Sequence, residues 1–180
     1  MLGSARASST REYQLLSTTN ITSTGSQNYT IPAGAVYIEV EMWGGGGGGG
    51  DWGQYGGGRG STTTSGAGGG GGAYFKKKIQ NIYLIENYTI QFTVGAGGAV
   101  GDGNGQTEGK GSDGGNSQVV GMSNSGGVQV IGFSNYLANG GEGGEGGYNG
   151  TSSGGAGGTS QNGKKILAAT RVAIHIAPRR

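Results

Sequence analysis

The chain has 180 residues, enough for one domain, and a formal net charge of +2 with 12% charged residues. This charge balance is too neutral for a nucleic-acid-binding protein that depends on phosphate contacts. The chain has no cysteine, which excludes disulfide bonds, thiolate metal sites and cysteine nucleophiles. Its opening residues lack the apolar core of a signal peptide, and no apolar run reaches membrane-spanning length, so we expect no membrane insertion.

Glycine dominates the composition, at 47 of 180 positions. Ordering each glycine costs roughly 1–2 kcal/mol of backbone entropy, slightly more than for other residues. The glycine tracts are therefore either flexible linkers or held by some regular arrangement.

Residues 1–26 are rich in serine and threonine and carry a short apolar patch at Tyr13, Leu15 and Leu16. We expect an extended N-terminal arm over 1–26 and a glycine-rich β domain over 27–180. The three apolar side chains would bury area on another protein during assembly. A disordered tail is the alternative.

The segment Ala35–Trp43 has the clearest strand pattern, because apolar and polar residues alternate along it. One face carries Val36, Ile38, Val40 and Met42, and the other carries Tyr37, Glu39, Glu41 and Trp43. Further strands are expected at 27–31, 73–80, 88–94, 118–120, 128–133 and 171–176. The pattern predicts an all-β fold, with a small sandwich or jelly-roll-like pair of sheets.

Two charged groups lie within these strands. Lys76, Lys77 and Lys78 form a run that indicates a solvated strand able to block edge pairing, with an anion-binding site as the alternative. Glu39 and Glu41 share a strand face, and we interpret them as exposed solubilising charges.

The tract at 140–148 reads GGEGGEGGY and repeats every third residue, with Glu142, Glu145 and Tyr148 in the third positions. The polyproline II helix has three residues per turn. In that conformation two edges of the tract would be bare backbone, and the third would display the side chains. Bare edges let neighbouring tracts approach and form lateral backbone hydrogen bonds. We therefore expect the tracts to pack as polyglycine II helices.

The sequence carries no convincing catalytic, cofactor or metal motif. The segment GKGSDG at 109–114 matches the dinucleotide-binding pattern, but it neither follows an expected strand nor opens a helix. Asp102, Asn104 and Gln106 alternate like the start of a calcium loop, but Thr107 replaces the required glycine. His175 is the only histidine. We expect a non-enzymatic protein without cofactor or metal.

Five segments carry a family resemblance: YTIPAGAVYIEVEMWGGGGGGG at 29–50, GGGGGAYFKKKI at 68–79, YTIQFTVGAGGAV at 88–100, GGEGGEGGYNG at 140–150 and RVAIHIA at 171–177. Together they resemble the glycine-rich domain of bacteriophage tail-fibre and related virion proteins. The resemblance implies a β-rich scaffold with glycine tracts, often at a fibre tip where exposed loops contact the host. This chain departs from the pattern in showing no fibre shaft or long coiled coil.

On this resemblance we expect a structural, surface-exposed virion component, either a fibre-tip adhesin or a capsid decoration protein, made in the cytoplasm of the host bacterium. Its partners would be other virion proteins, further copies of itself (a trimer if it follows many phage fibres), and a host cell-surface glycan or protein. The candidate binding residues are Trp52, Tyr55, Arg59, Glu142, Glu145 and Tyr148. The alternatives are an ice-binding protein and a bacterial surface carbohydrate-binding module.

Overall fold

The computed structural model describes residue 15 and residues 17–33, 35–55, 62–80, 87–103, 109–123, 136–147, 153–156, 158–159 and 172–178. Every regular element in this part of the chain is a β-strand, so the expected all-β fold is confirmed. The strands are β1 (Ser17–Ile21), β2 (Gly25–Thr30), β3 (Ala35–Trp43), β4 (Gly53–Tyr55), β5 (Thr62–Thr64), β6 (Tyr74–Gln80), β7 (Thr89–Val94), β8 (Ser117–Ser123), β9 (Tyr136–Ala138) and β10 (Val172–Pro178).

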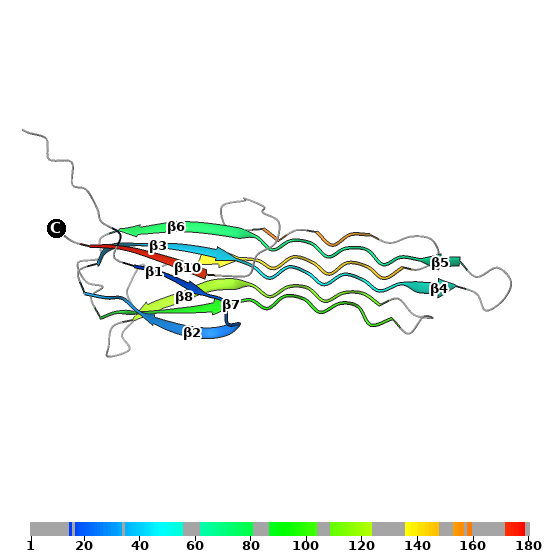
Figure 1. Cartoon of the computed structure of the whole chain (residues 1–180), viewed down its shortest axis with the longest axis horizontal. Coiled ribbons are helices and arrows are strands. Elements are labelled where there is room, and N and C mark those ends of the chain that lie inside the picture. Colours follow the sequence, from blue (N-terminus) through cyan, green and yellow to red (C-terminus); the bar gives the residue numbers. More distant parts are fainter. Residues whose placement is uncertain are drawn as a thin grey trace, which may run out of the picture.

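Eight strands form two four-stranded antiparallel sheets at one end of the molecule (Figure 1). The first sheet has the order β1-β10-β3-β6, and the second has the order β2-β7-β8-β9. The remaining strands, β4 and β5, form a two-stranded ribbon at the opposite end. The glycine-containing segments run between the two ends.

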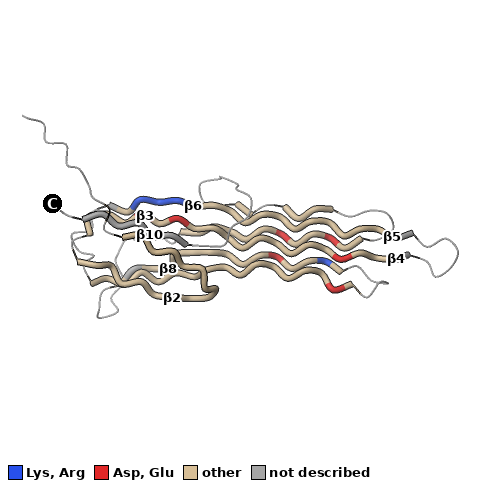
Figure 2. Tube along the Cα trace, viewed as in Figure 1, with Lys and Arg blue, Asp and Glu red and all other residues tan. Residues whose placement is uncertain are grey.

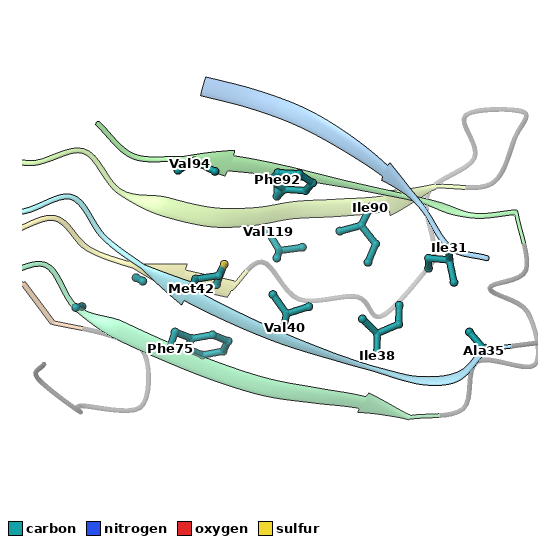
Figure 3. Close-up of a cluster of buried hydrophobic side chains, with 12 residues drawn as sticks. Ile31, Ala35, Ile38, Val40, Met42, Phe75, Ile90, Phe92, Val94 and Val119 are labelled. Carbon is teal, nitrogen blue, oxygen red and sulfur yellow. The ribbon is translucent and has the colours of Figure 1, made fainter. Parts of the chain in front are cut away.

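The hydrophobic core lies between the two sheets, as Figure 3 shows. The alternation expected in β3 is observed, because Ile38, Val40 and Met42 are fully buried. They meet Ile90 and Phe92, which β7 contributes from the second sheet. Full burial of each such side chain stabilises the fold by roughly 1.5–3 kcal/mol. The finer assignment to a sandwich or jelly roll stays a prediction.

Part of the expected N-terminal arm belongs to the first sheet instead. β1 pairs with β10, with Ser17 opposite Ile176 and Ile21 opposite Val172, and β2 begins at Gly25. An edge strand such as β1 is held mainly by backbone hydrogen bonds on one side, so it needs little apolar patterning. Its sequence, STTNI, supplies one large apolar residue, Ile21, which packs partly buried against the core.

Other expectations agree with the structure within a few residues, except where the structure does not describe the chain. The strand expected at 128–133 lies outside the described residues, as do Tyr13 and Leu16 of the expected arm. Strands β4, β5 and β9 were not anticipated, because each has only three residues. No helix long and apolar enough to cross a membrane occurs among the described residues.

Candidate functional site: a bundle of glycine tracts

Six glycine-containing segments form a bundle that extends from the sheets to the β4–β5 ribbon (Figure 1). We name them tract 1 (44–52), tract 2 (65–73), tract 3 (95–103), tract 4 (109–116), tract 5 (139–147) and tract 6 (153–156 and 158–159). Tracts 1, 3 and 5 leave β3, β7 and β9 respectively, and tracts 2 and 4 return to β6 and β8. The sheets therefore fix where five of the tracts begin or end.

The tracts are joined by lateral backbone hydrogen bonds with N···O distances of 2.7–3.2 Å. Every third amide of tract 1, from Gly44 to Gly50, donates to a carbonyl of tract 2. The amides that follow, from Gly45 to Asp51, donate to tract 4 with the same repeat. Lateral bonding with a three-residue period is what packed polyproline II-type helices require. The tracts are therefore ordered in the expected three-residue register.

The hydrogen bonds place the six tracts in two rows. Tract 1 bonds to tracts 2, 3, 4 and 5, and tract 5 bonds to tracts 1, 2, 4 and 6. Among the described residues, tract 3 bonds only to tracts 1 and 4, and tract 6 only to tracts 2 and 5. These pairings give one row with the order 3-1-2, lying on a second row with the order 4-5-6. Tracts 1 and 5 are the central members.

Glycine is sterically required wherever one tract faces another. A Cβ atom at Gly47 would lie 2.0 Å from the carbonyl oxygen of Glu142, and one at Gly48 would lie 1.8 Å from that of Ala99. Tract 3 has fewer neighbours and is blocked at every third position only, at Gly95, Gly98 and Gly101. Of the intervening positions of tract 3, four carry side chains (Ala96, Ala99, Val100 and Asp102), and Gly97 has room for one. The glycine content of a tract therefore follows the number of its neighbours.

The outward edge of tract 5 displays Glu142 and Glu145, which are both exposed. This confirms the expected display of these two residues, while Tyr148 lies outside the described part of the chain. Beside them, Asp113 Oδ1 accepts from the amide of Gly143 at 2.8 Å. One turn away, Asn116 Oδ1 accepts in the same way from Gly140 at 2.9 Å. Side chains therefore satisfy the amides of Gly140 and Gly143 on this side of the bundle.

Two of the aromatic candidates, Trp52 and Tyr55, lie at the end of the bundle near β4. Trp52 directly precedes β4 and is 49% exposed, and Tyr55 is the last residue of β4. The Asp51 carboxylate accepts from the amides of Trp52 and Gly103, at 2.7 and 3.1 Å, and so joins tract 1 to tract 3. Arg59 lies outside the described residues.

The structure does not gather the described candidates into one cluster. Trp52 and Tyr55 lie at the end of the bundle, whereas Glu142 and Glu145 lie along its side. Trp43, at the end of β3 where tract 1 begins, packs against Tyr74 of β6, with the ring centroids 5.0 Å apart.

Sequence reasoning missed the residue that connects the bundle to the sheets. Ser117, the first residue of β8, is fully buried. Its hydroxyl donates to the carbonyl oxygen of Trp43 at 2.6 Å and accepts from the amide of Gly95 at 2.9 Å. It thus links the starts of tracts 1 and 3. No sequence signal distinguishes this serine from the exposed ones, because only the tertiary fold buries it.

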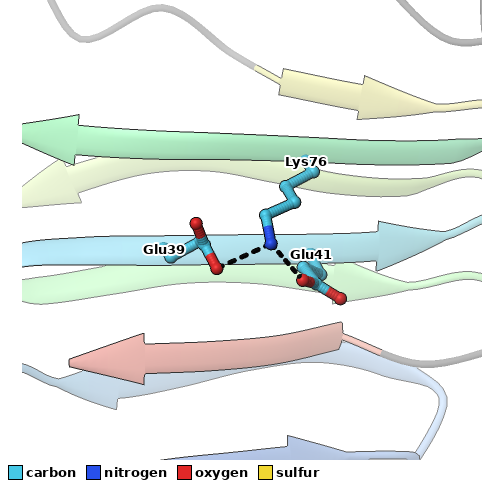
Figure 4. A network of polar contacts seen from close by, with 3 residues as sticks. All are labelled: Glu39, Glu41 and Lys76. Carbon is cyan, nitrogen blue, oxygen red and sulfur yellow. Dashed lines mark hydrogen bonds and ion pairs between the residues drawn. The ribbon is translucent and has the colours of Figure 1, made fainter. Parts of the chain in front are cut away.

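The outer face of the first sheet carries a small ionic network, shown in Figure 4. Lys76 Nζ lies 2.8 Å from carboxylate oxygens of both Glu39 and Glu41. Hydrogen bonds to these two carboxylates raise the pKa of Lys76 well above its usual range. Burial, followed by the charge of Glu41, raises the pKa of Tyr74. The two glutamates therefore hold a lysine of the edge strand β6.

Among the residues that the structure describes, no group of three histidine, aspartate or glutamate side chains could hold a metal ion. The structure defines the class of the protein as an all-β scaffold that carries a hydrogen-bonded glycine bundle. A family model described as a glycine-rich domain matches residues 21–171, so the chain belongs to this family. A search of curated proteins finds no match.

Proposed function

We propose that this protein is a structural, non-enzymatic component of the surface of a bacteriophage particle, as a fibre-tip adhesin or a capsid decoration protein. The observation that carries the proposal is the position of the β4–β5 ribbon, which the glycine bundle holds far from the sheets (Figure 1). Such an arrangement suits a protein that attaches at one end and presents a binding surface at the other.

The bundle has the properties of a stiff spacer. Its tracts are cross-linked by peptide hydrogen bonds at each three-residue turn, and the central tracts have neighbours on several sides. Each such bond contributes about 1 kcal/mol net, so the lateral bonds offset part of the backbone entropy lost by the ordered glycines. A spacer built this way needs no hydrophobic core along its length.

The end near β4 is the proposed contact surface for a host glycan or protein. Trp52 supplies an exposed aromatic ring there, and Tyr55 lies in the adjoining strand. Tryptophan, tyrosine and arginine dominate the binding energy of many interfaces, which supports including Arg59 and Tyr148 in the proposed set. Glu142 and Glu145 would flank this surface along the bundle.

The sheet end, with the residues that precede it, is the proposed attachment to other virion proteins or to further copies. Leu15 is 57% exposed, although Ser17 two residues later belongs to β1. With Tyr13 and Leu16 it would bury apolar area on a neighbour, contributing about 25 cal/mol for each Å² removed from water. Removal of residues 1–16 tests this role without deleting β1.

Labelling of intact particles tests the proposal directly. Phage particles from the strain that encodes this chain would be incubated with an antibody against the protein and viewed by electron microscopy. The expected result is label at a fixed position on the particle. Label confined to cell debris, with unlabelled particles of normal composition, would overturn the virion assignment.

The adhesive role has its own test. The isolated protein should bind host cells, and Trp52→Ala should weaken that binding at least about tenfold, the loss typical of an interface hot spot. Lys77→Ala, on an exposed residue of β6, is the control and should bind normally. Equal binding by all three proteins would exclude the end near β4 as the contact surface.

A further inference from the structure

One side of the bundle contains glycines that the chain itself does not require. A Cβ atom at Gly46 or Gly49 would meet its nearest neighbour at 3.6 Å, an ordinary van der Waals distance. Gly97 has a comparable clearance of 3.9 Å, and a Cβ atom at Gly68 would meet no atom within 4 Å. None of the four has the left-handed backbone that favours glycine. Alanine would fit at each position, and it would restrict the unfolded chain more than glycine does.

These four glycines lie on the same side of the bundle. Gly46 and Gly49 are on tract 1, Gly68 on tract 2 and Gly97 on tract 3, which together form the row 3-1-2. The second row covers the other side of this row. We call the side formed by the four glycines the open face.

The open face also carries backbone groups without partners. Within the described residues, the amides of Gly46 and Gly49 and the carbonyls of Gly47 and Gly50 form no hydrogen bond, although the other amides of 44–51 all do. On the opposite side of the bundle, Asn116 and Asp113 accept from the amides of Gly140 and Gly143. The open face therefore offers donors and acceptors with the three-residue repeat that joins the tracts inside the bundle.

The open face and the opposite side of the bundle also differ in their charged residues and in their exposed apolar side chains. The described charged residues of the second row are Lys110, Asp113, Glu142 and Glu145, whereas the first row has only Asp51 and Asp102, near the β4 end (Figure 2). Two exposed apolar side chains border the open face. Val100, one turn beyond Gly97, is 77% exposed, and Trp52 lies one turn beyond Gly49. An uncharged surface with exposed apolar side chains at its margin is typical of an interaction site.

We infer that the open face docks against the open face of a second copy of this chain. A partner must approach as closely as one tract approaches another, so it must itself present bare glycine backbone. It must also offer both amides and carbonyls at a three-residue repeat. The open face meets both conditions, since it contains unpaired groups of each kind. When the same face of two copies is in contact, the two copies are related by a two-fold axis and no open face is left for a third copy. The contact would therefore produce a dimer rather than an open chain of copies.

Sedimentation of the full-length protein over a range of concentrations tests the inference. The wild-type protein should show a reversible monomer–dimer equilibrium. The double variant Gly46→Ala/Gly49→Ala should raise the dissociation constant of the dimer at least about tenfold, equivalent to 1.4 kcal/mol. The two methyl groups hold the second copy away from the tract while touching nothing closely within their own chain. Thermal unfolding of the dilute variant should match or exceed that of the wild type.

The control variant is Lys110→Ala, which changes an exposed charged residue of tract 4, in the opposite row. It should dimerise like the wild type. A wild-type protein that stays monomeric at the highest soluble concentration would overturn the inference. A folded glycine variant that dimerises as tightly as the wild type would also overturn it. Thermal hysteresis by a protein that stays monomeric would overturn it too, and would indicate that the open face binds ice.

Discussion

Gly144 lies so close to the carbonyl oxygen of Ala67 that a Cβ atom at position 144 would be 2.2 Å from it. Its amide also donates to the carbonyl of Gly48 at 2.8 Å. The next residue, Glu145, is exposed on the outside of the same tract. A change of one position along the chain thus moves a residue from the interior of the bundle to its surface.

Gly144→Val is therefore expected to destabilise the protein strongly. The added side chain cannot fit between tracts 5 and 2, so the tracts must separate and lose lateral hydrogen bonds. We expect a loss of about 3 kcal/mol or more in the free energy of unfolding, at the upper end of single-residue effects. Denaturant titration followed by circular dichroism measures it. Glu145→Gln should change the same quantity by less than about 0.5 kcal/mol. Similar losses in both variants would contradict the three-residue register.

The rates of amide hydrogen exchange in tract 1 should vary with a three-residue period. In dilute monomer, the amides of Gly47 and Gly48 are protected by bonds to tracts 2 and 4, whereas those of Gly46 and Gly49 have no acceptor among the described residues. The unbonded amides should exchange at least about 100-fold faster than their bonded neighbours, because they need no opening of the bundle. Amide-resolved exchange by NMR is the measurement. Uniform rates along 44–51 would indicate that the tract is not held as described.

Ser117→Ala should loosen the junction between sheets and bundle. The substitution leaves the buried amide of Gly95 without its acceptor and removes the donor to Trp43. An unsatisfied buried polar group costs about 1–3 kcal/mol, which is the expected loss in unfolding free energy. Ser112→Ala, at an exposed serine in tract 4, is the matched control and should be nearly neutral. If Ser117→Ala left the free energy of unfolding unchanged, other groups would have to stabilise the junction between the sheets and the bundle.

Stability should decline in strongly alkaline solution. The pKa values of Lys76 and Tyr74 are both raised in the folded protein, so above about pH 10 the folded state binds more protons than the unfolded state. The free energy of unfolding should therefore be nearly constant from pH 7 to 9 and fall as pH rises through the folded pKa values.

The variant Lys76→Met tests the lysine contribution to this decline. Because Lys76 is 44% exposed, its ion pairs contribute no more than about 1 kcal/mol at pH 7. That difference between wild type and variant should persist to about pH 10 and shrink above it. Lys77→Met, beside it on β6, should show no such effect. A difference that grows with pH would contradict the assignment.

The strand pattern and the period of the glycine tracts could be predicted from the sequence, because both depend on local spacing. Alternation in Ala35–Trp43 places Ile38, Val40 and Met42 on one face of any sheet that the segment joins. Likewise, side chains at every third position of a three-residue helix share one edge, so Glu142 and Glu145 had to be displayed together. Membership in the glycine-rich family agrees with these features.

The pairing of elements distant in sequence could not be predicted, because it depends on neighbours that local spacing does not specify. Nothing in STTNI indicates that β1 would pair with β10, and nothing at Ser117 indicates its burial between tracts 1 and 3. Within the unbroken glycine run at 44–50, all seven residues are identical in sequence. Only the row order of the tracts decides that Gly48 faces a carbonyl at 1.8 Å while Gly49 has room for a side chain. Local chemistry thus determined the conformation of each tract, and tertiary packing decided which of its edges became interior and which stayed open.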